Sequence, residues 1–505
     1  MTTRPTLSRA LLRSSDLRSR PLTVPSESIA ALPERAVQFG TGALLRGLVE
    51  SCIDDANARG RFNGRVVMVG STGSGRDAQL NAQDGLYTLV SQGLVDGRRY
   101  RELRVIGAVS RALVAATEWD EVLRCAKSDR LECIFSNTTE VGIVLDERDA
   151  ADAPSEPRSF PGRLTRFLQH RAEHFAFDPA RTPVVIPCEL IDRNGARLRE
   201  IVLALAERWR LDARVLGWLE TVLFCDTLVD RIVPGAPTEE RRAALVAELG
   251  YDDAMLTVCE PFRLFAIQGD DALRARLGFA EERGVVVASD IGPYRERKVR
   301  LLNGAHTALV SLALLAGFRT VREAVEDPLL GHFLRTVLFD EIVPSVDVPG
   351  AEQFAREVLD RFANPDIDHS LWDITLQGTT KMRVRVVPTI IAYSARTGRA
   401  PRGLAQAFAG CLAFQRGSFQ SARLAERLPV PADDVAPAVR AHWAAHDDEP
   451  ASLAGFVRSV CADEALWGAN LAALPGFVEL VAETLETLLH SSVAAALTSS
   501  PEAVA

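Results

Sequence analysis

Residues 37–47 read VQFGTGALLRG, and this stretch decides the fold. A short apolar run ends at two glycines, Gly40 and Gly42, and an amphipathic stretch then continues to about Ala58. Strand, glycine turn and helix in this order are typical of the start of a dinucleotide-binding βαβ unit. A second apolar run at 66–69 lies at the right distance to be the next strand of that unit.

The glycine turn is not a complete GxGxxG pattern. Leu45 occupies the third glycine position, and the next glycine is Gly47. An ordinary tight turn could carry the same two glycines, but the strands and helix around them favour a cofactor site. After the second strand, residues 70–76 read GSTGSGR where NAD enzymes often have an acidic residue for the ribose. Small hydroxyl residues and Arg76 could accept a 2′-phosphate instead, so this segment leaves the choice of cofactor open. We expect NAD, with NADP not excluded.

The rest of the chain has two parts of different character. Further short strands are predicted at 103–109, 133–136, 184–186 and 284–288, with helical patterns between most of them. From Lys298 to Leu497 the pattern is almost wholly helical. We predict an α/β protein with a Rossmann-type doubly wound sheet and a mostly α-helical C-terminal domain. The expected boundaries are an arm at 1–34, a dinucleotide-binding domain at 35–290 and a substrate and catalytic domain at 291–505.

Composition narrows the class of protein. The chain has 505 residues, 47% hydrophobic content and a formal net charge of −9, so we expect two globular domains and no nucleic-acid partner. The eight cysteines contain no CxxC pair, which suits a reduced, cytoplasmic compartment and no metal. The most apolar stretch, 301–318, carries Asn303 and His306 and is expected to be a core helix and not a membrane span. The Arg-rich N-terminus lacks the apolar run of a secretory signal.

Lysine is nearly absent from the chain. Three lysines, Lys127, Lys298 and Lys381, stand beside 55 arginines. The two side chains exchange freely as solvated cations, but they differ where chemistry needs an amine that can lose its proton. Each remaining lysine is therefore a candidate for such a role, except Lys127, which lies in a polar surface-like stretch.

The segment 298–306 combines three reactive groups. If it is an α-helix, Asn303 lies about 140° and His306 about 80° around the axis from Lys298, so that one arc presents an amine, an amide and an imidazole. An amine in apolar surroundings gives up its proton more readily than one in water. We interpret Lys298 as the general acid/base, Asn303 as the donor to a developing alkoxide, and His306 as a hydroxyl contact or polarising group.

The same segment resembles the long-chain mannitol dehydrogenase family, whose metal-independent active site has the pattern Lys-x4-Asn-x2-His. Matching motifs spread over most of the chain: QFGTG at 38–42, QDGLYT at 83–88, SNTTE at 136–140, VDRI at 229–232, EPF at 260–262 and RFANP at 361–365. Within the family, PCELIDRNG at 187–195, RKVRLLNGAHTALV at 297–310 and TKMRVR at 380–385 are most similar to the branch that interconverts D-altronate and D-tagaturonate.

The resemblance implies roles for further residues. It makes Asp230 and Lys381 substrate contacts, together with His306. The residues expected to bind the dinucleotide are Phe39, Gly40, Thr41, Gly42, Leu44, Ser71, Asn137, Thr138, Thr139 and Glu140.

One position departs from the polyol branch of the family. Members acting on mannitol or mannonate carry Cys-Asp-Asn where this chain has Cys188-Glu189-Leu190, so a second oxyanion asparagine is missing. Asn194 is a candidate replacement as a substrate contact, although it could instead only hold the turn before Gly195. The departure argues against mannitol or fructuronate as the substrate.

A uronate substrate needs cations for its carboxylate. On a helix Lys381 and Arg385 share a face while Arg383 points away, and arginine forks suit carboxylates. A solvated basic stripe is the alternative for the two arginines.

We expect a cytoplasmic oxidoreductase, a monomer or small homo-oligomer without a membrane partner, that transfers hydride between NAD(H) and a small sugar acid. The sugar acid is a hexonate or keto-uronate, best D-altronate/D-tagaturonate. The alternatives are a related polyol or fructuronate (mannonate) oxidoreductase, a dinucleotide sensor without turnover, and a zinc alcohol dehydrogenase. The eight histidines do not support the last, since His170/His174 and His442/His446 are interpreted as surface pairs.

Overall fold

The fold is seen in a computed structural model of the whole chain. The structure describes residues 4–14, 17, 20–71, 73, 75–138, 142–150, 156–234, 237–416, 432–446 and 450–498. It has two compact units, one comprising Met1–Gln92 with Arg99–Ile291 and the other Gly93–Arg98 with Gly292–Ala505. We call them the Rossmann unit and the helical unit.

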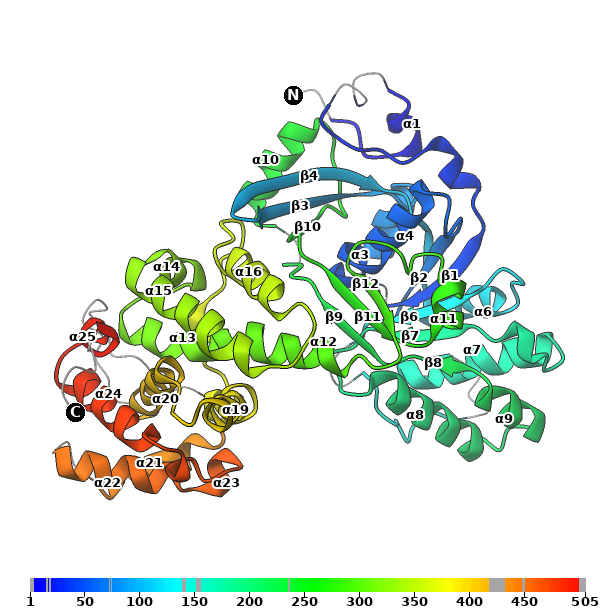
Figure 1. Cartoon of the computed structure of the whole chain (residues 1–505). Helices are drawn as coiled ribbons and strands as arrows, with labels where there is room; N and C mark the ends of the chain where they lie inside the picture. The colour runs from blue at the N-terminus through cyan, green and yellow to red at the C-terminus, as the bar shows by residue number, and fades with distance from the viewer. Residues whose placement is uncertain are drawn as a thin grey trace. The chain divides into compact units, whose positions relative to one another are not determined.

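The Rossmann unit is organised around a six-stranded sheet (Figure 1). Its order is β5-β2-β1-β6-β7-β8, and its pairings are parallel. Counted along the chain within this sheet, that is the order 3-2-1-4-5-6 of dinucleotide-binding folds, in which the ligand binds where the order reverses, beside β1. The strands are β1 (Glu34–Phe39), β2 (Arg65–Gly70), β5 (Val109–Val114), β6 (Cys133–Ser136), β7 (Val184–Pro187) and β8 (Leu223–Phe224).

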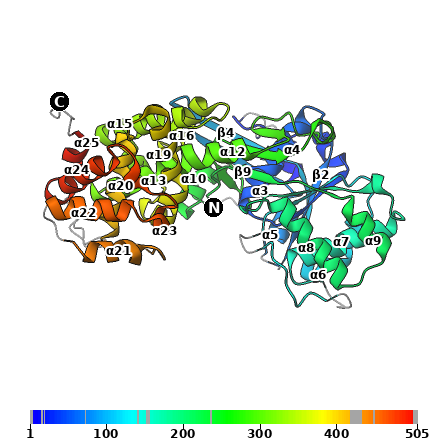
Figure 2. The ribbon, with the colours of Figure 1, turned by 60° about the horizontal axis from the view of Figure 1, so that its bottom comes forward.

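Alternating side chains build a core on each face of this sheet. In β1, Ala36 packs with residues of α3 (Ala43–Gly47) and α4 (Val49–Ala58) on one face. Val37 and Phe39 point to the opposite core, formed with helices that lie together in Figure 2. Those helices are α6 (Ala115–Ala126), α7 (Phe160–His174), α8 (Asn194–Arg208) and α9 (Ala213–Glu220).

Two three-stranded sheets complete the strands described in this unit. The strand predicted at 284–288 is confirmed as β12, but the sequence patterns did not reveal the two sheets. One has the order β10-β3-β4 and the other β12-β11-β9. The single strand predicted at 103–109 is wrong, because β4 ends at Ile106 and β5 begins at Val109. Gly107 lies between them, and its N–H donates to the buried Asp54 carboxylate over 2.9 Å in place of a strand neighbour. The strands are β3 (Tyr87–Val95), β4 (Arg98–Ile106), β9 (Thr227–Asp230), β10 (Thr257–Cys259), β11 (Leu264–Gln268) and β12 (Val285–Ala288).

The N-terminal segment packs on this unit. Leu7, Leu12 and Leu17 are buried in a core shared with β3, β4 and α10 (Glu239–Leu249). Bridges pair Thr6 with Asp252 and Thr23 with Arg104. The segment contains α1 (Arg9–Leu12) and η1 (Glu27–Ala31), and two further short helices of the unit are α5 (Arg76–Ala82) and α11 (Asp271–Arg276).

The helical unit surrounds α13 (Gly304–Leu315), which is almost entirely buried. No helix among the described residues is long and apolar enough to cross a membrane. Parallel sheet and helical C-terminal region confirm the predicted fold class. The other α-helices are α12 (Gly292–Arg297), α14 (Val321–Glu326), α15 (Pro328–Thr336), α16 (Ala351–Phe362), α17 (Leu371–Ile374), α18 (Gly378–Lys381), α19 (Val387–Thr397), α20 (Arg402–Gln415), α21 (Ala436–Ala444), α22 (Pro450–Cys461), α23 (Glu464–Trp467), α24 (Phe477–His490) and α25 (Val493–Thr498).

Short π-helical segments interrupt the α-helices of this unit. Within the described part of the chain they are η3 (Lys298–Asn303), η4 (Val337–Ile342) and η6 (Met382–Val386). π-Turns are rare and are found frequently at functional sites. Here η3 begins at one of the three lysines, and η6 begins directly after another.

Candidate active site

The glycine turn lies at the carboxyl end of β1, beside β6. Gly40 has φ +119°, a conformation that side chains with a Cβ rarely adopt. A Cβ on Gly40 would lie 2.7 Å from the main-chain oxygen of Asn137, which directly follows β6. Only glycine therefore lets the two strand ends approach this closely at the point where the strand order reverses.

Two side chains hold the turn from beneath, and the sequence patterns did not single out either. Gln38 Nε2 donates to the Gly40 carbonyl over 2.9 Å. The buried Arg46 guanidinium donates to the Thr41 carbonyl over 2.5 Å, and the Tyr87 hydroxyl donates to the Arg46 carbonyl over 2.7 Å. These bonds fix the direction in which the turn presents its N–H groups.

Gly42 and Gly47 serve two different functions of a dinucleotide-binding turn, approach of the ligand to the backbone and close packing of the helix. Gly42 begins α3 with φ −66°, and a Cβ there would meet nothing within 4 Å, so its surface is open to a ligand. Gly47 instead packs against the protein, because a Cβ there would lie 2.8 Å from Cγ2 of Val233. Close packing of the helix, which the third glycine normally serves, has thus moved two residues along the chain. Leu44 is half-buried in the first turn of α3.

Three other predicted dinucleotide residues, Phe39, Asn137 and Thr138, lie at the ends of β1 and β6. Phe39 is buried, and its ring lies 5.4 Å from that of Phe160, so it supports the turn from the core. Asn137 Nδ2 donates to the Cys188 carbonyl over 2.8 Å. The Thr138 N–H and hydroxyl both donate to Glu189, at 3.0 and 3.1 Å. Thr139 and Glu140 lie outside the described residues.

Glu189 is the buried anchor of this strand end, a role missed from sequence. Besides Thr138, its carboxylate accepts from the Ser136 hydroxyl at 3.0 Å. Burial raises the pKa of Glu189, while its hydrogen bonds to Thr138 and Ser136 act in the opposite direction. The neighbouring Leu190 is 59% exposed, which leaves an apolar side chain on the surface where the polyol branch has its asparagine.

The end of β2 carries Ser71, which is exposed. Asp77, in the first turn of α5, is 7% exposed, and its Oδ1 is buried without a hydrogen-bond partner among the described residues. A Cβ on Gly70 would lie 3.7 Å from that oxygen, so an acidic group does lie near the end of β2. The sequence pattern did not predict Asp77 because this residue lies seven positions after the strand and not at its end.

Two predicted substrate contacts belong to the Rossmann unit. Asp230 is 8% exposed at the end of β9. Asn194 is fully buried: its Nδ2 lies 2.9–3.0 Å from three acceptors, and its Oδ1 accepts from the N–H groups of Gly195 and Thr227. The amide is fully used inside the protein, which favours the structural alternative for Asn194.

In the helical unit, Lys298 and Asn303 begin and end η3. The Gly304 N–H donates to the Val299 carbonyl, an i to i+5 bond. Such a bond places residue i+5 over residue i, so Asn303 lies one turn above Lys298, and the angle of about 140° expected for an α-helix is wrong. Both residues are half-buried, and the Asn303 amide makes no hydrogen bond to a described residue.

His306 lies against aromatic rings one turn further on. Its ring stacks on Phe362 at 3.9 Å and meets the His369 ring edge-on at 4.9 Å. Its Nε2 is buried without a hydrogen-bond partner among the described residues. Burial lowers the pKa of His306 well below its ordinary value, and the positive charges of Arg361 and Arg385 act in the same direction. His306 is therefore neutral at neutral pH and can donate or accept a hydrogen bond.

The helices carrying Lys298 and Lys381 touch at two points. Arg300 Nη1 donates to the Val384 carbonyl over 3.3 Å. A Cβ on Gly304 would lie 3.2 Å from the Arg385 carbonyl oxygen, so glycine lets η3 and η6 pack backbone to backbone.

Cations gather beside His306. Lys381 Nζ donates to the Ile374 carbonyl over 3.0 Å, and burial together with the charge of Arg385 lowers the pKa of Lys381. Arg385 is half-buried with no ion pair or hydrogen bond to a described residue, and burial lowers its pKa. Arg383 is exposed and donates to the Ala465 carbonyl at 3.2 Å, which confirms that it points elsewhere.

No group of three or more His, Cys, Asp or Glu side chains suited to a metal occurs among the described residues. All eight cysteines are buried and unpaired.

A Rossmann unit with a glycine turn, followed by a helical unit carrying an amine, an amide and an imidazole, is the architecture of a two-domain dehydrogenase. Residues 34–280 match the mannitol dehydrogenase Rossmann domain, and residues 290–489 match the mannitol dehydrogenase C-terminal domain. The chain belongs to the mannitol dehydrogenase family, which confirms the resemblance noted in its motifs.

Several proteins of known activity are similar to this chain over most of its length. An altronate oxidoreductase of Yersinia enterocolitica is 41% identical over 481 residues, covering 92% of this chain and 96% of its own. One of Bacillus subtilis is 40% identical over 456 residues, covering 89% and 92%. Among solved structures, Pseudomonas fluorescens mannitol 2-dehydrogenase, in a ternary complex with NAD and D-mannitol, has a TM-score of 0.66 at 26% identity, covering 97% and 98%.

Proposed function

We propose that the protein is an NAD-dependent oxidoreductase that interconverts a hexonate and its keto-uronate, namely D-altronate and D-tagaturonate. The observation that carries the proposal is the cluster in the helical unit: Lys298 and Asn303 one π-turn apart, next to a neutral His306 and two half-buried cations. The named altronate oxidoreductases support the same substrate pair.

The Rossmann unit fits a dinucleotide. Gly40 forms a cradle that a Cβ would fill, and the open surface at Gly42 leaves room for a pyrophosphate against the backbone. The unpartnered Asp77 oxygen suits a ribose hydroxyl and would repel a 2′-phosphate, which favours NAD over NADP. When bound, NAD(H) supplies or accepts the hydride.

The chain's own groups carry the proton chemistry. In the reducing direction Lys298 Nζ donates a proton to the ketone oxygen of the substrate as that oxygen gains charge. The Asn303 amide, which bonds to no residue in the described part of the chain, donates a hydrogen bond to the same oxygen and stabilises the alkoxide. His306, held neutral by burial, orients a substrate hydroxyl without adding a charge.

The substrate carboxylate pairs with cations of the same unit. Arg385 is half-buried, and none of the described residues provides an anion for it. The guanidinium has therefore lost part of its hydration without gaining an ion pair, and an anionic ligand would offset this cost. A carboxylate forked on its guanidinium, with Lys381 beside it, supplies that partner. We keep Asp230 as a hydroxyl contact and leave Asn194 out, since its amide is already satisfied.

A substrate panel tests the proposal. Steady-state rates on D-tagaturonate, D-fructuronate and D-fructose, each with NADH and NADPH, should give the highest kcat/KM for D-tagaturonate with NADH. A preference for D-fructuronate or D-fructose would replace the substrate with that of the related branches. Tight NADH binding without turnover on any of the three would instead make the protein a dinucleotide sensor.

A further inference from the structure

A pocket of about 180 Å³ in the Rossmann unit is lined by more arginines than residues of any other type. It is formed by the end of α4, strands β3 and β4, and the segments that follow β9 and precede β11 and β12. Five guanidinium groups and two carboxylates face it. The lining residues are Asp55, Arg59, Leu89, Ser91, Tyr100, Glu102, Arg104, Arg231, Pro261, Arg263 and Arg283.

The pocket is separate from the dinucleotide turn. The turn precedes α3, whereas Asp55 and Arg59 stand at the far end of α4. From Val49 to Asp55 the helix rises about 9 Å, while Arg231 reaches back to the carbonyl of Gly47, after the turn. A ligand in this pocket would thus not touch the glycines that hold the pyrophosphate.

The carboxylates at the pocket leave part of the positive charge uncompensated. Arg104 also lies 3.9 Å from the carboxylate of Asp54, which is outside the lining. Asp55 is shared: Arg104 bonds to one oxygen, and Arg263 donates to the other over 2.6 Å. Glu102 accepts from the Tyr100 hydroxyl at 3.0 Å. Arg59 pairs with Glu282, which lies outside the lining. Arg283 is exposed and makes no ion pair with a described residue.

Arg231 is the decisive group. It is only 8% exposed, yet its hydrogen bonds go to uncharged acceptors: the carbonyls of Glu260 and Gly47 and the hydroxyls of Ser51 and Ser91. A buried cation that is not matched by an anion is costly. It directly follows Asp230 in the VDRI motif, and the EPF motif supplies Pro261, so two family motifs each contribute a residue without an assigned role to this pocket.

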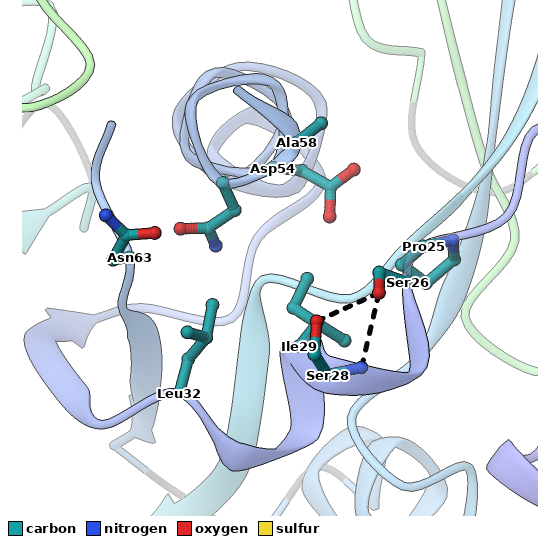
Figure 3. Close-up of a pocket in the computed structure, with 9 residues that line it drawn as sticks. Pro25, Ser26, Ser28, Ile29, Leu32, Asp54, Ala58 and Asn63 are labelled. Atoms are coloured by element: carbon teal, nitrogen blue, oxygen red, sulfur yellow. Dashed lines mark hydrogen bonds between the residues drawn. The ribbon is translucent and has the colours of Figure 1, made fainter. Parts of the chain in front are cut away.

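A neighbouring cavity gives a contrast. It has about 110 Å³ and lies between α4 and η1 (Figure 3). Its lining combines Asp54 with uncharged polar and apolar side chains, the polar ones being Ser26, Ser28, Asn57 and Asn63. Its lining includes no cation, and Ser26 and Ser28 bond to each other at 2.9 Å. Unmatched positive charge is thus a property of the arginine pocket and not of every hollow in this region.

We propose that the arginine pocket binds a phosphate group, either inorganic phosphate or the phosphate of a monoester. Guanidinium forks match the oxygens of a tetrahedral anion, and a dianion balances more of the excess charge than a single carboxylate would. The Ser91 hydroxyl adds a donor, and the volume holds a phosphate with several waters. This goes beyond the proposed oxidoreductase function and does not depend on it.

Calorimetric titration of the full-length protein with inorganic phosphate, in a chloride buffer, tests the site. Binding should saturate at one phosphate per chain. Arg283→Ala should weaken it roughly tenfold and Arg283→Lys by less, since the charge is kept. Arg130→Ala, which removes an exposed arginine elsewhere, is the matched control and should change nothing.

NADH titrations with and without phosphate, and a parallel titration with a sugar phosphate, complete the test. The NADH affinity should be the same in both buffers, and the tighter of the two phosphates identifies the source of the ligand. The proposal is overturned if binding does not saturate, if Arg283→Ala binds like wild type, or if phosphate competes with NADH.

Discussion

Replacing Gly40 by alanine should damage both the fold and the cofactor site, whereas the same change at Gly42 should damage only the cofactor site. Alanine at φ +119° costs about 1–3 kcal/mol of backbone strain. The added Cβ also lies 2.7 Å from a main-chain oxygen that can move only with β6, and overpacking of this kind costs about 1–3 kcal/mol more. The free energy of unfolding should fall by about 2–6 kcal/mol.

Gly42 provides the matched control. Its φ of −66° suits alanine, and a Cβ there meets nothing within 4 Å. The loss of a glycine N-cap, up to about 1 kcal/mol, is offset by the lower entropy of the unfolded chain. A methyl group on this surface nevertheless keeps a pyrophosphate from the backbone, so NADH affinity should fall at least roughly tenfold.

Thermal unfolding followed by fluorescence, together with NADH titration, separates the two variants. At about 2 °C per kcal/mol, Gly40→Ala should lower Tm by about 4–12 °C, and Gly42→Ala should stay within about 2 °C of wild type. Equal Tm values for both variants, or unchanged NADH affinity in Gly42→Ala, would refute the reasoning about the turn.

Three further predictions concern other parts of the molecule. Burial raises the pKa of Glu50 to about 7, and the charge of Arg46 offsets only part of the effect. Because this pKa is raised in the folded state, the protonated group favours folding below pH 4.5, and this contribution is lost as pH rises through 7. The free energy of unfolding of Glu50→Gln, measured with denaturant, should therefore exceed that of wild type by up to about 3 kcal/mol at pH 8 and by little at pH 5. Phe362→Leu removes the ring stacked on His306 and should lower kcat roughly three- to tenfold without changing NADH affinity. Phe333 is buried elsewhere in the helical unit, so the control variant Phe333→Leu should keep kcat within twofold of wild type. A larger loss of kcat in Phe333→Leu than in Phe362→Leu would contradict the role of the stack. Prolonged treatment with a chelator should leave turnover intact, and loss of activity restored by zinc would disprove metal independence.

The fold was predictable where local pattern and tertiary structure agree. Residues 37–47 alternate, turn at glycine and become amphipathic, and each feature points to the same βαβ unit. The boundary between β4 and β5 was not predictable, because it depends on a hydrogen bond from Gly107 to Asp54, 53 residues away. Arg46 was missed for the same reason: its role rests on a carbonyl in the turn and on Thr257, far along the chain.

The candidate site was predictable in its residue types and less so in its geometry. The scarcity of lysine and the family pattern singled out Lys298, Asn303 and His306. The expected angle of about 140° between Lys298 and Asn303 assumed an α-helix, because nothing in the sequence indicates a π-turn. The supporting rings of Phe362 and His369 come from elsewhere in the chain, so only tertiary structure reveals why His306 is neutral.

The most direct test of the central claim is the pre-steady-state reduction of D-tagaturonate by NADH in Lys298→Ala. A general acid/base contributes about 10²–10⁴ in rate, so hydride transfer should slow by that factor while the Kd of NADH stays at the wild-type value. Added small amines should restore part of the rate, because they replace the missing proton donor. Hydride transfer within tenfold of wild type would contradict the assignment of Lys298 and the mechanism built on it.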